Sequence, residues 1–189
     1  MNFQKMTNLL AFLLILPIAT AACFSKTGGK EMSNLEFFKS LDFSDGLSVV
    51  TSVFERFPMQ YATTLGADGN PQIRPIEFKF EEEDALYFDT VVFYTSYAEL
   101  VEHPYIQICI GDQETMTYVR LGGKVNFTKD KRIIDRCFKE SPVLTSQFGD
   151  KRDVVIGYYL TDAWAEFSSF SNELPNKKYS LTNHFDKRE

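Results

Sequence analysis

The segment GNPQIRPIEFKF, residues 69–80, alternates between apolar and polar side chains, as a half-buried strand does. Its apolar members are Ile73, Ile76, Phe78 and Phe80, and its polar members are Arg74, Glu77 and Lys79. Pro75 follows Arg74 directly and has no N–H group for a sheet ladder. We therefore expect a strand that pairs incompletely with one neighbour and presents an arginine on its polar face.

Short strands and tight turns continue on both sides of this segment. Residues 66–70, GADGN, have the composition of a hairpin turn. The hydrophobic patterns predict strands at 59–65, 71–80, 85–90, 105–111, 116–127, 154–160 and 164–170, and helices at 34–41, 46–57, 95–102 and 129–140. We expect Thr95 or Ser96 to cap the third helix, Thr161–Ala163 to be a turn, and Gly122-Gly123 to mark a bulge. This order favours a mainly β fold, a closed antiparallel barrel of about six or seven strands with peripheral helices.

The overall composition limits the class of protein. The chain has 189 residues, which suits one domain with a substantial core. Its formal net charge of −6 argues against a nucleic-acid-binding protein, which would carry a basic face. We find no cysteine and histidine spacing typical of a metal site, so no metal is expected.

The N-terminus reads as an export signal. Residues 9–19, LLAFLLILPIA, are apolar but too few for a membrane-spanning helix, which needs about 20 residues. Thr20-Ala21-Ala22 and then Cys23 follow, in an order that resembles a bacterial lipoprotein signal. We therefore predict a signal peptide at 1–22, lipidation of Cys23, a polar tether at 23–33 and a location in the cell envelope. Simple cleavage, giving a periplasmic or secreted soluble protein, is the alternative.

Two further cysteines lie in the body of the chain. Cys109 belongs to the apolar run IQICIG, and Cys137 belongs to the helical pattern RIIDRCFKE. We interpret both as small buried hydrophobic residues. Their spacing leaves open whether they form a disulfide.

Five segments in order carry a family resemblance: YATTLGADGNPQIRPIEFKFEEEDALYFDT, ELVEHP, IQICI, YVRLGGKVNFTKD and AEFSSFS. Together they resemble the split-barrel flavin-binding proteins related to pyridoxamine 5′-phosphate oxidase, and especially their small single-domain members. The resemblance covers roughly residues 46–171. It implies a split barrel, a domain that we place at 34–171 before a polar C-terminal tail at 172–189. We expect that tail to be a partly disordered arm.

The resemblance also implies a homodimer that binds FMN in clefts between the subunits. Arg74 would reach the phosphate, and the backbone of Pro75, Ile76 and Glu77 would lie beside the flavin ring. Thr90, Thr95 and Ser96 would hold the phosphate with hydroxyl groups near a helix N-terminus, where free amides favour an anion. Arg120 is placed like an arginine common in this family, and it would either point at the ligand or pair across the sheet.

The chain departs from the family at the loop 91–94, VVFY, where relatives usually carry lysine or arginine. A flavin without strong phosphate contacts, F420, haem or an empty cleft therefore all stay open. Arg74 itself has a plainer interpretation, as a polar-face residue paired with Glu77 or another acid.

These observations lead to one main functional hypothesis and two rivals. The main hypothesis is an exported or lipid-anchored flavoprotein, an FMN-dependent oxidoreductase that acts on a small molecule. The flavin would perform the chemistry, so we assign no catalytic side chain. The rivals are a non-catalytic flavin- or haem-binding module of the same fold and a cofactor-free structural lipoprotein. The substrate and electron donor stay open.

Overall fold

The computed structural model describes residues 32–183 and 185–186. The predicted signal peptide, the lipidation residue Cys23 and most of the predicted tether lie outside these residues. Within the described part of the chain, no helix combines the length and the apolar character needed to cross a membrane.

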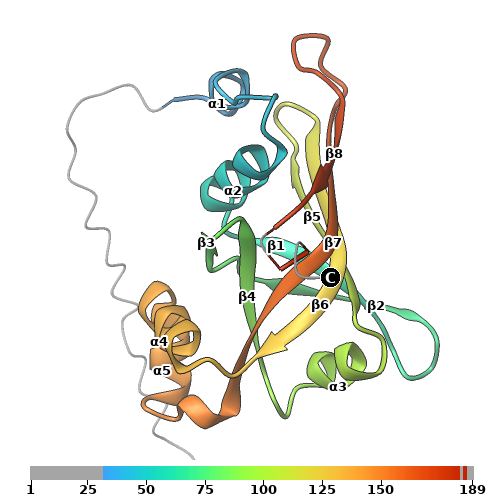
Figure 1. Ribbon diagram of the computed structural model, residues 1–189. Coiled ribbons are helices and arrows are strands. Elements are labelled where there is room, and N and C mark those ends of the chain that lie inside the picture. The colour runs from blue at the N-terminus through green and yellow to red at the C-terminus, as the bar shows by residue number, and fades with distance from the viewer. Residues whose placement is uncertain (1–31, 184, 187–189) are drawn as a thin grey trace, which may run out of the picture. The chain divides into compact units, whose positions relative to one another are not determined.

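An antiparallel sheet of eight strands forms the body of the described chain (Figure 1). The strands are β1 Gln60–Leu65, β2 Pro71–Ile76, β3 Phe80–Glu82, β4 Ala85–Val91, β5 Tyr105–Asp112, β6 Thr117–Thr128, β7 Val155–Ser169 and β8 Lys177–Leu181. The order in the sheet is β2–β1–β5–β6–β7–β4–β3, and β8 also pairs with β7. The predicted mainly β, split-barrel architecture is confirmed.

A buried glutamine of β1, Gln60, binds the segment that connects β2 to β3 and the end of α2. The Phe78 amide donates to the Gln60 side chain at 2.8 Å, and the Gln60 amide donates to the carbonyl oxygens of Phe54 and Phe57. The predicted single strand at 71–80 is therefore wrong: β2 ends at Ile76 and β3 begins after this connection. The strand path of the described chain, from β2 to β3, does not close on itself, as expected for a split barrel.

The longest strand, β7, was predicted as two strands separated by a turn, and this is also wrong. Asp162 takes a left-handed backbone conformation with φ 48°, but the chain does not reverse there. Instead β7 pairs with β6 both before and after Asp162, and the register of this pairing shifts between Gly122 and Lys124. The predicted irregularity at Gly122-Gly123 is thus confirmed, and the extra residue lies on β7, where Asp162 and Ala163 face the single residue Gly123.

In the described residues the sheet is accompanied by five α-helices and one short 3-10 helix: α1 Asn34–Lys39, α2 Gly46–Arg56, α3 Thr95–Glu102, α4 Lys131–Glu140, α5 Pro142–Phe148 and η1 Arg152–Val154. Ser33 and Glu36 form a capping box on α1, and the Asp45 side chain caps α2. The buried side of α2, which includes Val50 and Phe54, packs into the main core inside the sheet. Figure 1 shows α1 and α2 together on one side of the sheet.

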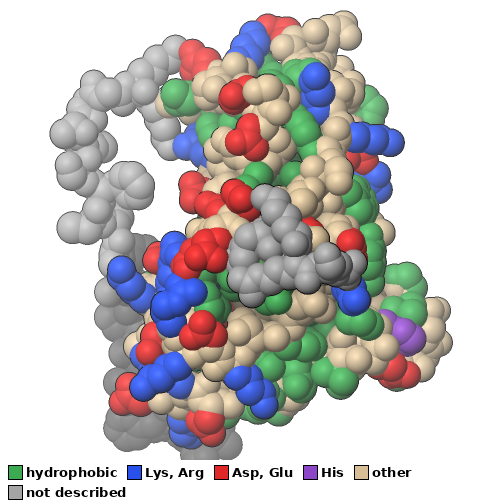
Figure 2. Space-filling model, viewed as in Figure 1, with side chains coloured by type: hydrophobic (Ala, Val, Ile, Leu, Met, Phe, Trp, Pro, Cys, Tyr) green, Lys and Arg blue, Asp and Glu red, His purple; other side chains and the backbone are tan. Residues whose placement is uncertain are grey.

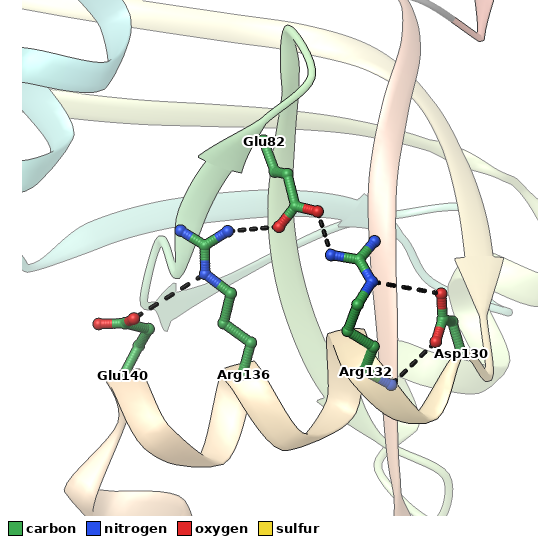
Figure 3. A network of polar contacts seen from close by, with 5 residues as sticks. All are labelled: Glu82, Asp130, Arg132, Arg136 and Glu140. Carbon is green, nitrogen blue, oxygen red and sulfur yellow. Dashed lines mark hydrogen bonds and ion pairs between the residues drawn. The ribbon is translucent and has the colours of Figure 1, made fainter.

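A second, smaller core lies where α4 and α5 pack on β3, β4 and the start of β7. Ile133 and Phe138 of α4 are buried there against Tyr87. On the outside, Glu82 of β3 accepts bonds from Arg132 and Arg136 of α4 (Figure 3). The helix α5 was not predicted, because its seven residues are too few to show a periodic pattern.

The C-terminal segment is more ordered than we expected. We expected the tail at 172–189 to be a partly disordered arm, and this is wrong for Lys177–Leu181, which form β8 along β7. Tyr179 of β8 packs against the main core and donates from its hydroxyl to the Phe43 carbonyl at 3.2 Å. Pairing with β7 makes a strand of a polar sequence that has little strand preference of its own.

Candidate functional site

An open hollow of about 740 Å³ lies between β2, β4, the start of α3 and α5, and we call it the site hollow. Its lining includes every residue that the sequence predicted for the cofactor except Thr95 and Arg120: Arg74, Pro75, Ile76, Glu77, Thr90 and Ser96. The other lining residues are Pro58, Met59, Lys79, Asp89, Val91, Tyr94, Ser141, Val143, Leu144, Gln147 and Phe148. Residues from four separate segments therefore meet at one hollow, whose volume is typical of small-molecule sites.

Arg74 lines the site hollow, and its guanidinium is held by an acid of α3. Nη1 lies 2.7 Å from Glu99 Oε2, and Nη2 lies 3.3 Å from Glu99 Oε1. The Thr64 hydroxyl accepts from Nη1 at 2.5 Å and donates to Glu99 Oε2 at 2.5 Å. Arg74 thus pairs with an acid, as its plainer interpretation held, but the acid is Glu99 and not Glu77.

Glu99 stays ionised in this arrangement although only 5% of its side chain is exposed. Burial alone would raise the pKa of Glu99, but the bonds from Arg74 and Thr64 outweigh it and hold the pKa below its usual value. The group therefore behaves as a buried ion pair with a hydroxyl bridge, and it ties α3 to the β1–β2 hairpin.

Lys79 is a second cation at the site hollow, and the sequence analysis assigned it no role there. Its side chain is 3% exposed, and Nζ lies 2.6 Å from Glu77 Oε2 and 3.3 Å from Asp89 Oδ2. The Ser141 hydroxyl, at the start of α5, donates to the same Glu77 oxygen at 2.8 Å. Lys79 lies beyond the end of β2 at Ile76, so strand alternation alone could not assign it to the site.

Asp89 is the least satisfied acid of this cluster. Burial raises the pKa of Asp89, and the positive charge of Lys79 only partly opposes that rise. Its Oδ2 atom is buried and makes no hydrogen bond within the described residues, since its contact with Lys79 is an ion pair outside hydrogen-bond geometry. A buried carboxylate oxygen whose only ion-pair partner among the described residues is an ammonium group shared with Glu77, beside a hollow, is a position where a ligand donor would be favourable.

Neutral donors lie at the end of the site hollow nearest α3. The hydroxyls of Thr90 and Ser96 are 3.3 Å apart, and both residues line the hollow. Tyr94 is the N-cap of α3 and makes no side-chain capping bond, so the predicted capping by Thr95 or Ser96 is wrong. The first amides of α3 therefore lack a side-chain acceptor beside these hydroxyls.

Apolar side chains are exposed at the connection between β4 and α3. Phe93 is 64% exposed and lies edge-on to Tyr94 and to Phe148 of α5. Figure 2 shows hydrophobic side chains over the lower middle of the view, where Figure 1 places this connection, and charged side chains gathered over α4 to their left. The segment 91–94 thus forms an aromatic and aliphatic rim where relatives were expected to have cations.

Arg120 lies away from the site hollow. Its Nε donates to Glu166 Oε2 at 3.0 Å, directly across from β6 to β7, and its guanidinium lies 5.6 Å from the centre of the Trp164 ring. Of the two predicted roles, pairing across the sheet is the one that the structure shows. Trp164 packs on Gly122, where an added Cβ would come within 2.6 Å of the indole.

A second hollow of about 730 Å³ is lined by Thr63, Thr64, Leu65, Pro71, His103, Pro104, Tyr105, Gln107, Lys124 and Asp162. Thr64 belongs to this second hollow and bonds to Arg74 of the site hollow. The Arg74–Thr64–Glu99 group therefore stands between the two hollows.

The two cysteines within the described residues are free. Cys137 is buried as predicted, and burial raises its pKa to about 12. The prediction for Cys109 is wrong, because this residue is exposed on the outer face of β5. Neither cysteine lines the site hollow.

Comparisons with known proteins agree with this architecture. The sequence model of the family described as pyridoxamine 5′-phosphate oxidase matches residues 49–150. No curated protein sequence matches the chain.

Several solved structures have a similar fold. A NimC/NimA family protein from Clostridium acetobutylicum is 19% identical, with a TM-score of 0.64 over 77% of this chain and 94% of that one. A second C. acetobutylicum protein, related to general stress protein 26 of B. subtilis and of the pyridoxinephosphate oxidase family, is 13% identical, with a TM-score of 0.58 over 71% and 94%. A haem-binding protein from Mycobacterium smegmatis is 10% identical, with a TM-score of 0.52 over 65% and 52%. At these identities the likeness concerns the fold.

Proposed function

Because this chain belongs to the pyridoxamine 5′-phosphate oxidase family, we propose that it binds a flavin in the site hollow and serves as a flavin-dependent oxidoreductase for a small molecule. The observation that carries the proposal is the convergence of Arg74, Ile76, Thr90 and Ser96, predicted from separate segments, on one hollow of about 740 Å³. FMN is the flavin that the family resemblance implies.

The residues present fit a flavin in size and in chemistry. Ile76, Val91, Leu144 and Phe148 give an apolar lining suited to a flat ring. Thr90 and Ser96, with the first amides of α3, offer neutral donors suited to the ribityl chain and its end. Asp89 Oδ2 offers a buried acceptor that no described residue satisfies by a hydrogen bond.

In the reaction, the protein would hold and orient the flavin and shield its ring from water. A bound flavin supplies hydride or electron transfer, and the surrounding residues set its position and electrostatic environment. Lys79 is held in place by Glu77 and Asp89, so its ammonium group is fixed at the wall of the hollow. The rim around Phe93 and Phe148 would limit the access of water to the ring.

We also propose that the protein is an exported homodimer, lipid-anchored through Cys23. The outer face of β1, β2 and β5 supports the dimer, because Tyr61, Ile73 and Tyr105 are large apolar residues between 46% and 69% exposed there. Exposed apolar side chains that share a sheet face are typical of an interaction surface. Gel filtration of the mature protein and mass spectrometry of its N-terminus test these two proposals.

The flavin proposal is tested by the visible spectrum of the purified protein, before and after addition of FMN or riboflavin. Flavin absorption bands that stay with the protein through gel filtration support it. A Soret band would instead favour the haem-binding alternative. A colourless protein that retains no added flavin would contradict the proposal.

A matched pair of variants locates the bound flavin. Val143 lies on α5, is 55% exposed and lines the site hollow, so Val143→Trp should narrow the hollow without disturbing the core. Val101 on α3 is 57% exposed and lines neither hollow, so Val101→Trp is the control. We expect Val143→Trp to weaken flavin binding at least about tenfold, the cost of losing roughly 1.4 kcal/mol of contact, and Val101→Trp to leave it unchanged.

A further inference from the structure

We propose that the site hollow recognises the ring and ribityl chain of a flavin and gains no affinity from a terminal phosphate, so that riboflavin binds at least as tightly as FMN. This inference rests on the proposed function, because it ranks ligands for the same hollow. It concerns which part of the flavin the protein binds, and it follows from the charges in the wall of the hollow.

Each cation that lines the site hollow is already paired with an acid. Arg74 is bidentate on Glu99, and Lys79 contacts both Glu77 and Asp89. Within the described residues, the lining carries two cations, Arg74 and Lys79, and two acids, Glu77 and Asp89. Glu99 adds a third acid behind Arg74. A phosphate dianion would therefore meet no cationic side chain that is free of an acid, and only the partial positive charge of the first amides of α3.

This balance holds in both protonation states of Asp89. If Asp89 is ionised, the five groups sum to a charge of −1, and if it is protonated they sum to zero. To bind either cation directly, a phosphate would have to displace a carboxylate that is already in ion-pair contact. Such an exchange gives little net gain, since a new charge-assisted bond replaces an existing one.

The remaining donors in the lining are neutral. Thr90, Ser96 and Gln147 carry hydroxyl or amide groups, which suit the hydroxyls of a ribityl chain and the polar edge of a flavin ring. Val91 and Phe148 provide apolar contact for the ring itself. These groups bind the part of the molecule that FMN and riboflavin share.

The ratio of the two dissociation constants measures the contribution of the phosphate. In a site with a free cation, one charge-assisted hydrogen bond to the phosphate would favour FMN about tenfold or more. Titration of the flavin-free protein with FMN and with riboflavin, followed by flavin fluorescence, gives both constants. We expect FMN to bind no more tightly than riboflavin.

The outcomes separate this inference from the proposed function. FMN binding tighter than riboflavin by more than the error of the titration would overturn the inference and leave the flavin site intact. Saturable binding of neither flavin would overturn both. Equal affinities, or tighter binding of riboflavin, support the inference.

Charge variants give a second, independent readout. Glu77→Gln removes one acid from Lys79 at a half-exposed position, and we expect it to shift the ratio of the FMN and riboflavin dissociation constants at least threefold toward FMN. Glu114→Gln, at the exposed turn between β5 and β6, removes the same charge away from the hollow and should leave the ratio unchanged. An unchanged ratio in Glu77→Gln would contradict the inference.

Discussion

The two hollows have almost the same volume, about 740 and about 730 Å³, and differ in how their charged residues are arranged. In the site hollow, Arg74 and Lys79 are part of buried ion-paired groups. In the second hollow, the cation Lys124 is exposed and has no ion pair within the described residues. Volume alone therefore does not identify a site here. The two hollows differ instead in their charged residues, since the site hollow has ion-paired cations in its wall and the second hollow has one that is unpaired within the described part of the chain.

The Arg74–Thr64–Glu99 group forms the wall between the hollows. Substitutions in this group should change the free energy of unfolding the most. Arg74→Ala leaves Glu99 buried without its cation, so we expect the free energy of unfolding at pH 7 to fall by about 3 kcal/mol. Urea denaturation measures this loss. The double variant Arg74→Met/Glu99→Met removes both charges and should recover most of it; if the double variant is less stable than Arg74→Ala, the group is not acting as an ion pair.

The same group predicts a pH dependence. The pKa of Glu99 is lowered in the folded protein, so its contribution is present above the unfolded pKa and is lost as the pH falls through the folded pKa. The destabilisation caused by Arg74→Ala should therefore be greatest near neutral pH and shrink below about pH 4.5, where the carboxyl becomes protonated. Denaturation at several pH values measures this trend, and a constant difference would contradict it.

Removing the Asp89 charge should change stability less, and in the opposite direction, because it should stabilise the protein. Burial raises the pKa of Asp89, so ionisation costs stability, and that cost grows as the pH rises from about 3.8. We expect Asp89→Asn to gain stability relative to the wild type as the pH rises, by about 1 kcal/mol, the size of a typical substitution effect. Thermal melts across this range measure the difference, and a variant that loses stability with rising pH would show that Lys79 outweighs burial.

Substitution of Lys124, in the second hollow, should change the free energy of unfolding the least. Lys124→Ala removes an exposed cation without an ion pair within the described residues, so the free energy of unfolding should change by no more than about 0.5 kcal/mol. Flavin affinity should stay at the wild-type value, as measured by the same fluorescence titration. A clear loss of flavin binding would move the functional assignment toward the second hollow.

Local patterns were sufficient to predict most of the fold. Alternation placed the strands β1, β4, β5 and β6 near their observed bounds, and helical spacing predicted α2 and α3. The wrong strand predictions concern segments whose conformation depends on tertiary contacts. The β8 segment becomes a strand only because β7 offers it a partner, and β7 stays one strand because β6 pairs with it across the irregularity at Asp162.

The candidate site was predicted only in part, because some of its residues lie in local patterns and others depend on tertiary contacts. Arg74 and Thr90 belong to strands whose patterns are local, and both line the site hollow. The partner of Arg74 was not predictable from spacing, because Glu99 lies 25 positions away on a helix whose orientation depends on packing. Lys79 was overlooked because the expected cations were sought in the loop after β4, whereas the chain supplies this one from the segment between β2 and β3.

The location of a bound flavin tests the central claim most directly. A crystal structure of the protein grown with riboflavin or FMN would show it. We predict the ring in the site hollow, against Ile76, Val91 and Phe148, with Arg74 still paired to Glu99. A flavin found in the second hollow, or crystals grown at saturating flavin in which the site hollow holds none, would contradict the account.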